Sequence, residues 1–173
     1  MKPGLWLSLG LWLLLAAIPA WGRRDPLSNA EVEQLRDVAQ QPEKRLPLYV
    51  QFVQSRMDTV GQLRDDPRFT ADRTARIHDL LEDVDTLVQE LDDNIDVYVQ
   101  QNMDIRKPLR TVIDMNSALE QRLRAIKRNS KPEELTNFGF ALDNAIASVV
   151  AIQEDARQVE QEQEEAVKNN KKK

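Results

Sequence analysis

The residues best suited to chemistry gather in two neighbouring stretches of opposite charge. Residues 72–96 contain nine acidic and two basic side chains, and residues 105–131 contain eight basic and two acidic ones. Carboxylates bind hard cations when several oxygens converge from a loop or from facing helices. The sequence contains no Asp-x-Asp-x-Asp-Gly loop that would supply them. We therefore expect the acids to face solvent or the basic stretch, and we predict no metal and no cofactor.

His78 is the single histidine of the chain, and Glu82 follows it by one helical turn. A di-metal helical bundle needs Glu-x-x-His motifs on two helices, and these motifs are absent. No catalytic pair of nucleophile and base can be assembled around one histidine at the edge of an apolar seam. Catalytic serine–lysine pairs and carboxylate pairs remain as alternatives. The pattern favours a solvated histidine and predicts a protein that is not an enzyme.

A basic cluster near the end of the second stretch is the candidate interaction patch. Its members are Arg122, Arg124, Lys127, Arg128 and Lys131. Cations suit the negative end of a helix dipole, so the cluster has an ordinary structural explanation if it also pairs with Asp79, Glu82 and Asp83. The alternative is a docking patch for an acidic protein or for anionic lipid head groups.

The composition limits the classes of function. The chain has 173 residues, a net charge of −5 and no cysteine. The lack of cysteine excludes disulfides, thiol catalysis and thiolate metal sites. The negative net charge argues against nucleic acid as a partner.

Residues 1–22 have the features of a secretory signal peptide. Lys2 precedes an apolar run over residues 5–18, and Ala20 and Gly22 supply the small residues of a cleavage site. Cleavage near Gly22 predicts an exported protein, periplasmic or secreted. The alternative is an uncleaved membrane anchor over residues 5–22, because the apolar run reaches the lower length limit of a membrane span.

Apolar residues recur at spacings of three and four along the rest of the chain, which predicts an all-α fold. We expect residues 23–27 to be a linker, residues 28–168 a helical bundle and residues 169–173 a basic disordered tail. The short connections favour an up-down antiparallel bundle of four main helices with a short extra N-terminal helix. The expected helices cover residues 28–40, 47–65, 70–101 and 108–129, and a fifth begins at the Ser130 capping box, has Pro132 in its first turn and runs to residue 159 with a frayed continuation.

Two capping boxes support these helix starts, one from Ser28 to Glu31 and one from Ser130 to Glu133. Pro47 and Pro108 are each expected at the first position of a helix, where the missing amide costs nothing. Thr70 is the expected N-cap of the third helix, with Asp72 in its first turn.

Residues 70–131 are predicted to form a hairpin in which the acidic arm lies against the basic arm. Residues 102–108 form either a turn between the arms or a kink in one long helix, and the opposite charges favour the turn. Asn116 falls on the apolar seam of the basic arm. A polar residue in such a seam costs stability and can fix helix register or oligomeric state.

These observations predict an exported, non-enzymatic helical-bundle protein that acts through protein–protein contacts in the cell envelope. The expected partner is an unidentified protein or a second copy of the chain. A membrane is a partner only if the leader is uncleaved. The alternatives are a bundle that binds an ion or small ligand between its helices and a membrane-anchored bundle that oligomerises.

Overall fold

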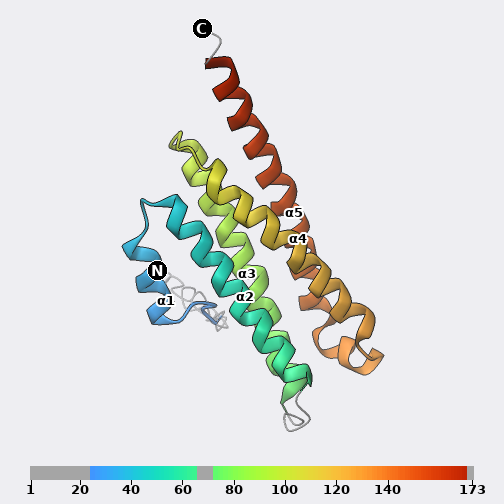
Figure 1. Cartoon of the computed structure of the whole chain (residues 1–173). Coiled ribbons are helices and arrows are strands. Elements are labelled where there is room, and N and C mark those ends of the chain that lie inside the picture. The colour runs from blue at the N-terminus through green and yellow to red at the C-terminus, as the bar shows by residue number, and fades with distance from the viewer. Residues whose placement is uncertain (1–23, 66–71, 171–173) are drawn as a thin grey trace, which may run out of the picture.

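The computed structural model describes residues 24–65 and 72–170, and every regular element in these two ranges is an α-helix. The elements are α1 (Asn29–Asp37), α2 (Pro42–Asp65), α3 (Arg73–Gln100), α4 (Arg106–Asn129) and α5 (Pro132–Asn170). The predicted all-α class is therefore confirmed. Figure 1 shows four long helices packed along one another and the short α1 on the outside of α2. The predicted leader, the expected N-cap Thr70 and residues 171–173 lie outside the described residues.

The hydrophobic core lies between α2, α3, α4 and α5. Each of these helices packs against two others: α3 against α2 and α5, and α4 against α5 and α2. Leu81 of α3, Leu109 of α4 and Leu142 of α5 are completely buried, and full burial of one such side chain contributes about 1.5–3 kcal/mol. The four helices thus form a ring in the order α2, α3, α5, α4.

The predicted hairpin of oppositely charged arms is wrong, because α3 and α4 occupy opposite corners of this ring. They follow one another in the sequence but do not form one of its packed helix pairs. The basic side chains of α4 instead contact α2 and α5. Arg122 binds Asp58 of α2 at 3.0 Å, and Lys127 binds Asp143 of α5 at 2.6 Å. Burial of the apolar seams decides which helices become neighbours, because exposed ion pairs contribute only about 0–1 kcal/mol each.

The connection between α3 and α4 is a turn, as the charge argument favoured, and not a kink. Asn102 adopts the left-handed conformation with φ of 57°. The amides of Asn102 and Met103 donate to the carbonyls of Val99 and Tyr98, at 2.9 and 3.0 Å. This is a Schellman motif, in which asparagine can replace the usual glycine. Asn102 is therefore the helix-ending signal in this segment, which the sequence analysis did not recognise.

Two prolines lie inside helices rather than at their first residues. α2 begins at Pro42 and continues through Pro47, and α4 begins two residues before Pro108. Pro108 is the third residue of α4, where an amide has no partner within the helix, whereas Pro47 lies deeper in α2, loses one backbone hydrogen bond and crowds the preceding turn. In α2 this cost falls near the N-terminus, where the extra turn buries Pro42 and Leu46 against the core. Burial of this additional turn explains why the helix starts before its second proline.

The start of α5 also differs from the expectation. Ser130 does not cap it, because its hydroxyl donates to the Ile126 carbonyl of α4 at 2.8 Å. The Lys131 amide instead donates to the Glu134 carboxylate at 3.0 Å. Pro132 was predicted in the first turn of this helix and is its first residue. The second capping box is therefore shifted by one residue and is only half formed.

α5 continues as a helix to Asn170, beyond residue 159 where its regular apolar pattern ends. Its side chains have structural partners. Gln163 accepts from the Ile105 amide at 3.0 Å and donates to the Met103 carbonyl at 2.9 Å. Arg110 of α4 binds Glu160 and Glu164 at 2.8 and 3.2 Å. The end of α5 thus clamps the α3–α4 connection and the start of α4.

α1 is attached to the bundle by polar contacts and by Leu35, which is buried and belongs to the hydrophobic core. The predicted box at its start is confirmed, with Ser28 and Glu31 hydrogen-bonded to each other through side chain and backbone. Glu31 also binds Arg56 of α2 at 2.5 Å. The Arg56 guanidinium holds the pKa of Glu31 at about 2, well below its usual range. The N-cap of α3 is Asp72, which was expected in the first turn after an N-cap at Thr70, and its side chain makes no capping hydrogen bond.

Candidate interaction surface

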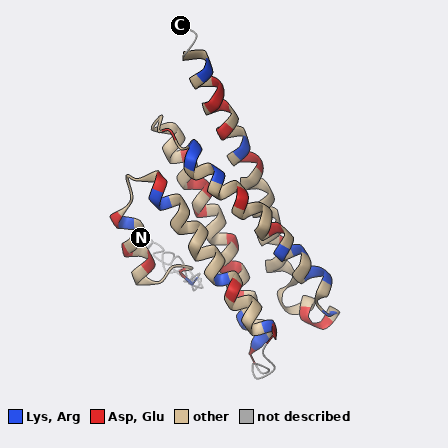
Figure 2. Ribbon diagram, in the orientation of Figure 1, with Lys and Arg blue, Asp and Glu red and all other residues tan. Residues whose placement is uncertain are grey.

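The predicted basic cluster lies on the last turns of α4 and in the connection that follows (Figure 2). Its five side chains are exposed. Arg122 and Lys127 are paired across to α2 and α5, and Arg124 binds Glu120 of its own helix at 2.7 Å. None of these partners is Asp79, Glu82 or Asp83, which belong to the distant α3. Three of the five positive charges are therefore paired with neighbouring carboxylates.

Asn116 is completely buried on α4, at the seam position that the sequence indicated. Neither its amide nitrogen nor its carbonyl oxygen has a hydrogen-bond partner among the described residues. The neighbouring Ser117 hydroxyl accepts from Gln153 of α5 at 3.1 Å. Asn116 is thus a buried polar group that the fold does not satisfy, and such a group costs about 1–3 kcal/mol.

Acidic side chains concentrate along the α3–α5 contact. Asp85 is buried and accepts from Ser148 of α5 at 2.5 Å and from Gln89 at 2.8 Å. Asp92 lies nearer the C-terminal end of α3. Burial and the charges of Asp155, Asp96 and Asp93 raise the pKa of Asp92 to about 6.

Three ionisable side chains converge on the outer surface of α3. The His78 Nδ1 atom lies 3.7 Å from a carboxylate oxygen of Asp79 and 3.8 Å from one of Glu82. His78 is one-third exposed, in agreement with the predicted position at the edge of the core. Arg24, which precedes α1, reaches the same part of α3 and binds Asp83 at 2.8 Å.

The most exposed apolar surface lies on α5, and the sequence analysis did not single it out. Phe140 is 79% exposed, and Val97 of α3 at 45% is the other large hydrophobic side chain that the described part of the chain leaves open. Ala147 and Ala151 are also exposed, two and three helical turns beyond Phe140, and Val150 is half-buried. Phe140 and Ala147 are seven residues apart, which is almost two full helical turns, so they lie on the same, outer face of the helix. We call Phe140, Ala147, Val150 and Ala151 the α5 outer face.

By length and composition α5 could cross a membrane, and it is the single helix in the described ranges with this property. One third of its apolar window is buried inside the bundle. Phe138, Leu142, Ala145 and Val149 form that buried face and contribute to the core. The bundle therefore buries one side of α5, whereas the other side carries Phe140, Ala147 and Ala151 together with the polar Asp143 and Asn144.

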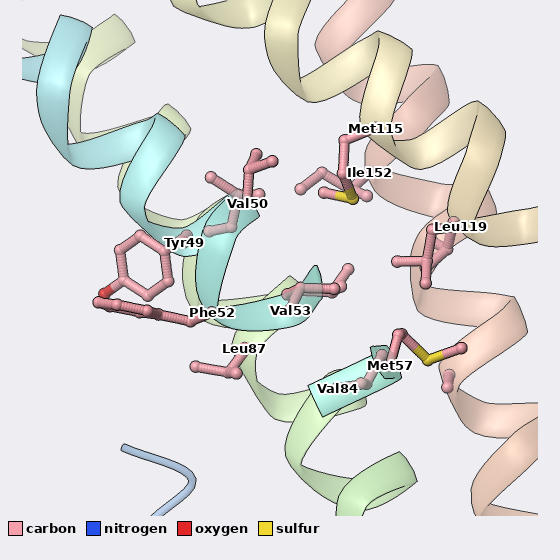
Figure 3. Close-up of a cluster of buried hydrophobic side chains, with 14 of the residues drawn as sticks. Tyr49, Val50, Phe52, Val53, Met57, Val84, Leu87, Met115, Leu119 and Ile152 are labelled. Atoms are coloured by element: carbon pink, nitrogen blue, oxygen red, sulfur yellow. The ribbon is translucent and has the colours of Figure 1, made fainter. Parts of the chain in front are cut away.

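Two hollows in the described part of the chain are poorly suited to a small ligand. An open hollow of about 380 Å³ at the start of α4 is lined by charged groups that are mostly paired, among them Arg106 with Asp104 and Arg110 with Glu160. A crevice of about 40 Å³ lies between α2 and α4. Figure 3 shows its apolar walls, with Val53 and Met57 on α2 and Met115 and Leu119 on α4. Drug-sized ligands occupy roughly 300–1,000 Å³ of enclosed and mainly apolar space.

Comparison of the chain with protein-family models, with curated proteins and with solved structures found no match.

Proposed function

We propose that this is an exported, non-enzymatic helical-bundle protein that acts by binding another protein, and that the α5 outer face makes the contact. The exposure of Phe140 carries the proposal. A large aromatic side chain at 79% exposure gains about 1.5–3 kcal/mol when a partner buries it. The small side chains of Ala147 and Ala151 would let a second helix approach closely along the same face. A helix or groove of apolar character is the chemistry that fits this surface.

The proposal includes the up-down antiparallel course of α2 to α5. Its support is the order of the contacts between the helices. Along α4 and α5, Lys127 meets Asp143 near the connection, whereas Arg110 meets Glu160 far from it. This order is expected of two antiparallel helices.

Contacts between α2 and α4 run in the same direction along both helices. Asp58 meets Arg122, and Arg64 further along α2 meets Ser130 further along α4. This order is expected if α2 and α4 are parallel. They are parallel neighbours in an up-down bundle in which α3 and α4 lie at diagonal positions of the ring.

Export is supported by the leader-like features of residues 1–22. The chain has no cysteine, so the exported protein could not use disulfides to stabilise an open ligand site, and binding through the surface of the packed bundle fits this composition. N-terminal sequencing of the protein recovered from the exported fraction tests this part. A mature chain that begins near Arg23 supports it. A chain that retains residues 5–22 in the membrane fraction favours the anchored, oligomerising alternative.

The binding face is tested by placing the photo-crosslinking residue benzoyl-phenylalanine at position 140. The matched control is the same residue at Gln161, which is exposed on the same helix but outside the α5 outer face. We expect a discrete crosslinked product from position 140 and none from position 161. A product of twice the chain mass identifies a second copy, and any other mass identifies a different protein. Equal crosslinking from both positions, or none from either, contradicts the proposal.

A further inference from the structure

We propose that His78, Asp79 and Glu82 form a surface site for a divalent transition-metal ion such as zinc. The inference is independent of the proposed protein contact, because it uses other residues on another helix. It also revises the sequence-based expectation of no metal site, which considered a loop and facing helices but not His78 together with its neighbours on one helix.

The spacing of the three residues places their side chains on one face of α3. Residues three and four apart are neighbours on a helix surface, so Glu82 lies beside both His78 and Asp79 and connects the two. Ile77 and Leu81 of the same turn are almost completely buried, so the backbone that carries the three ligands is fixed against the core. The site therefore needs no rearrangement of the main chain.

The distances suit a small ion. Nδ1 of His78 lies 3.7 Å from Oδ1 of Asp79 and 3.8 Å from Oε2 of Glu82, and the three ligand atoms lie within 4.8 Å of one another. Zinc bonds to nitrogen and oxygen are about 2.0–2.2 Å long, so two ligands of a tetrahedral zinc lie roughly 3.4 Å apart. Side-chain rotations that shorten the two His78 separations by a few tenths of an ångström, and the Asp79–Glu82 separation by at most about 1.4 Å, would bring all three atoms into bonding range.

The donor set selects the class of metal. Imidazole nitrogen suits zinc, copper and nickel, whereas calcium and magnesium prefer oxygen donors in larger numbers. The three side chains are between one-third and three-fifths exposed, so water or a group from a binding partner would complete the coordination. Three protein ligands with an open fourth position define an accessible site rather than a closed structural one.

Arg24 is the charged neighbour that opposes a cation here. Its guanidinium lies 3.9 Å from Oδ2 of Asp79 and binds Asp83 at 2.8 Å. It approaches Asp79 through Oδ2, which leaves the Oδ1 atom beside His78 open to a metal. Removal of this positive charge should tighten metal binding by roughly threefold at physiological ionic strength.

The test is a titration of the purified chain with zinc chloride, followed by calorimetry and by long-range ¹H–¹⁵N spectra of the imidazole. Because His78 is the chain's single histidine, these spectra contain one set of imidazole signals. We expect binding of one zinc ion per chain, with a shift of the Nδ1 resonance. H78Q should abolish binding, D79N and E82Q should each weaken it by at least tenfold, and R24Q should strengthen it.

The matched control is E154Q, which makes the same chemical change at an exposed glutamate of α5. It should leave zinc affinity unchanged, and circular dichroism should show that all variants remain helical. The proposal is overturned if zinc does not bind saturably, if it binds without shifting Nδ1, or if E82Q and E154Q have equal effects.

Discussion

At the scale of single residues, Asn116 is the side chain that packing explains least. Its amide is completely buried and unsatisfied among the described residues, in a seam otherwise formed by Val112, Leu119 and Leu123. Leucine branches at the same carbon but carries no polar atoms. We therefore predict that Asn116→Leu raises the free energy of unfolding by about 1–3 kcal/mol, measured by urea denaturation.

Asn116→Ala separates the cost of burying the unsatisfied amide from the effect of packing. It removes the amide, as Asn116→Leu does, but it leaves a cavity. It should be less stable than Asn116→Leu. If Asn116 also sets register or oligomeric state, the more stable leucine variant should show more than one species by light scattering or extra amide signals by NMR. A leucine variant less stable than the natural protein would contradict the prediction and would mean that the amide has a stabilising partner.

At the scale of helices, the α3–α5 contact carries an electrostatic cost at Asp92. Burial and three neighbouring carboxylates raise its pKa from 3.8 to about 6. A carboxyl whose pKa is higher in the folded state stabilises the fold fully below its unfolded pKa, and this contribution is lost as the pH rises through about 6. Asp92→Asn should therefore raise the free energy of unfolding at pH 7.5 by about 1–2 kcal/mol, a figure reduced for solvent screening.

Urea melts at pH 3.5 and pH 7.5 check this prediction, since the gain should shrink towards zero at the lower pH. Asp114→Asn is the matched control, because Asp114 is exposed on α4 and should change stability by less than about 0.5 kcal/mol at either pH. A gain of equal size at both pH values would show that the charge of Asp92 is not its source.

At the scale of the whole molecule, the ring order of the helices separates the acidic α3 from the basic α4. Charge reversals Asp83→Lys and Arg124→Glu should therefore be additive to within about 0.5 kcal/mol in a double-mutant cycle. Lys127→Glu with Asp143→Lys is the positive control, because these side chains touch at 2.6 Å. This second cycle should show a coupling of about 0.2–1 kcal/mol. A larger coupling between positions 83 and 124 than between 127 and 143 would contradict the ring order.

The sequence by itself determined the local features of this protein. The spacing of apolar residues determines that it is helical and which face of each helix is buried, as for Leu81, Leu109 and Leu142. The capping box at Ser28 and the first-turn position of Pro132 follow from short-range hydrogen bonding. The buried position of Asn116 follows from the same periodicity. Each of these features depends on neighbours within about one helical turn.

Only the tertiary structure decided which helices became neighbours. The opposite charges of the two stretches suggested that α3 and α4 pair. Exposed ion pairs are weak, however, and each long helix has an apolar seam that could pack against several others. The α5 outer face follows from that choice, since Phe140 is exposed because α3 and α4 cover the opposite side of α5. The cluster around His78 required side-chain directions that the spacing of residues permits but does not fix. The physical reason is that burial of large apolar surfaces outweighs the charge pattern, and that burial is a property of the assembled bundle.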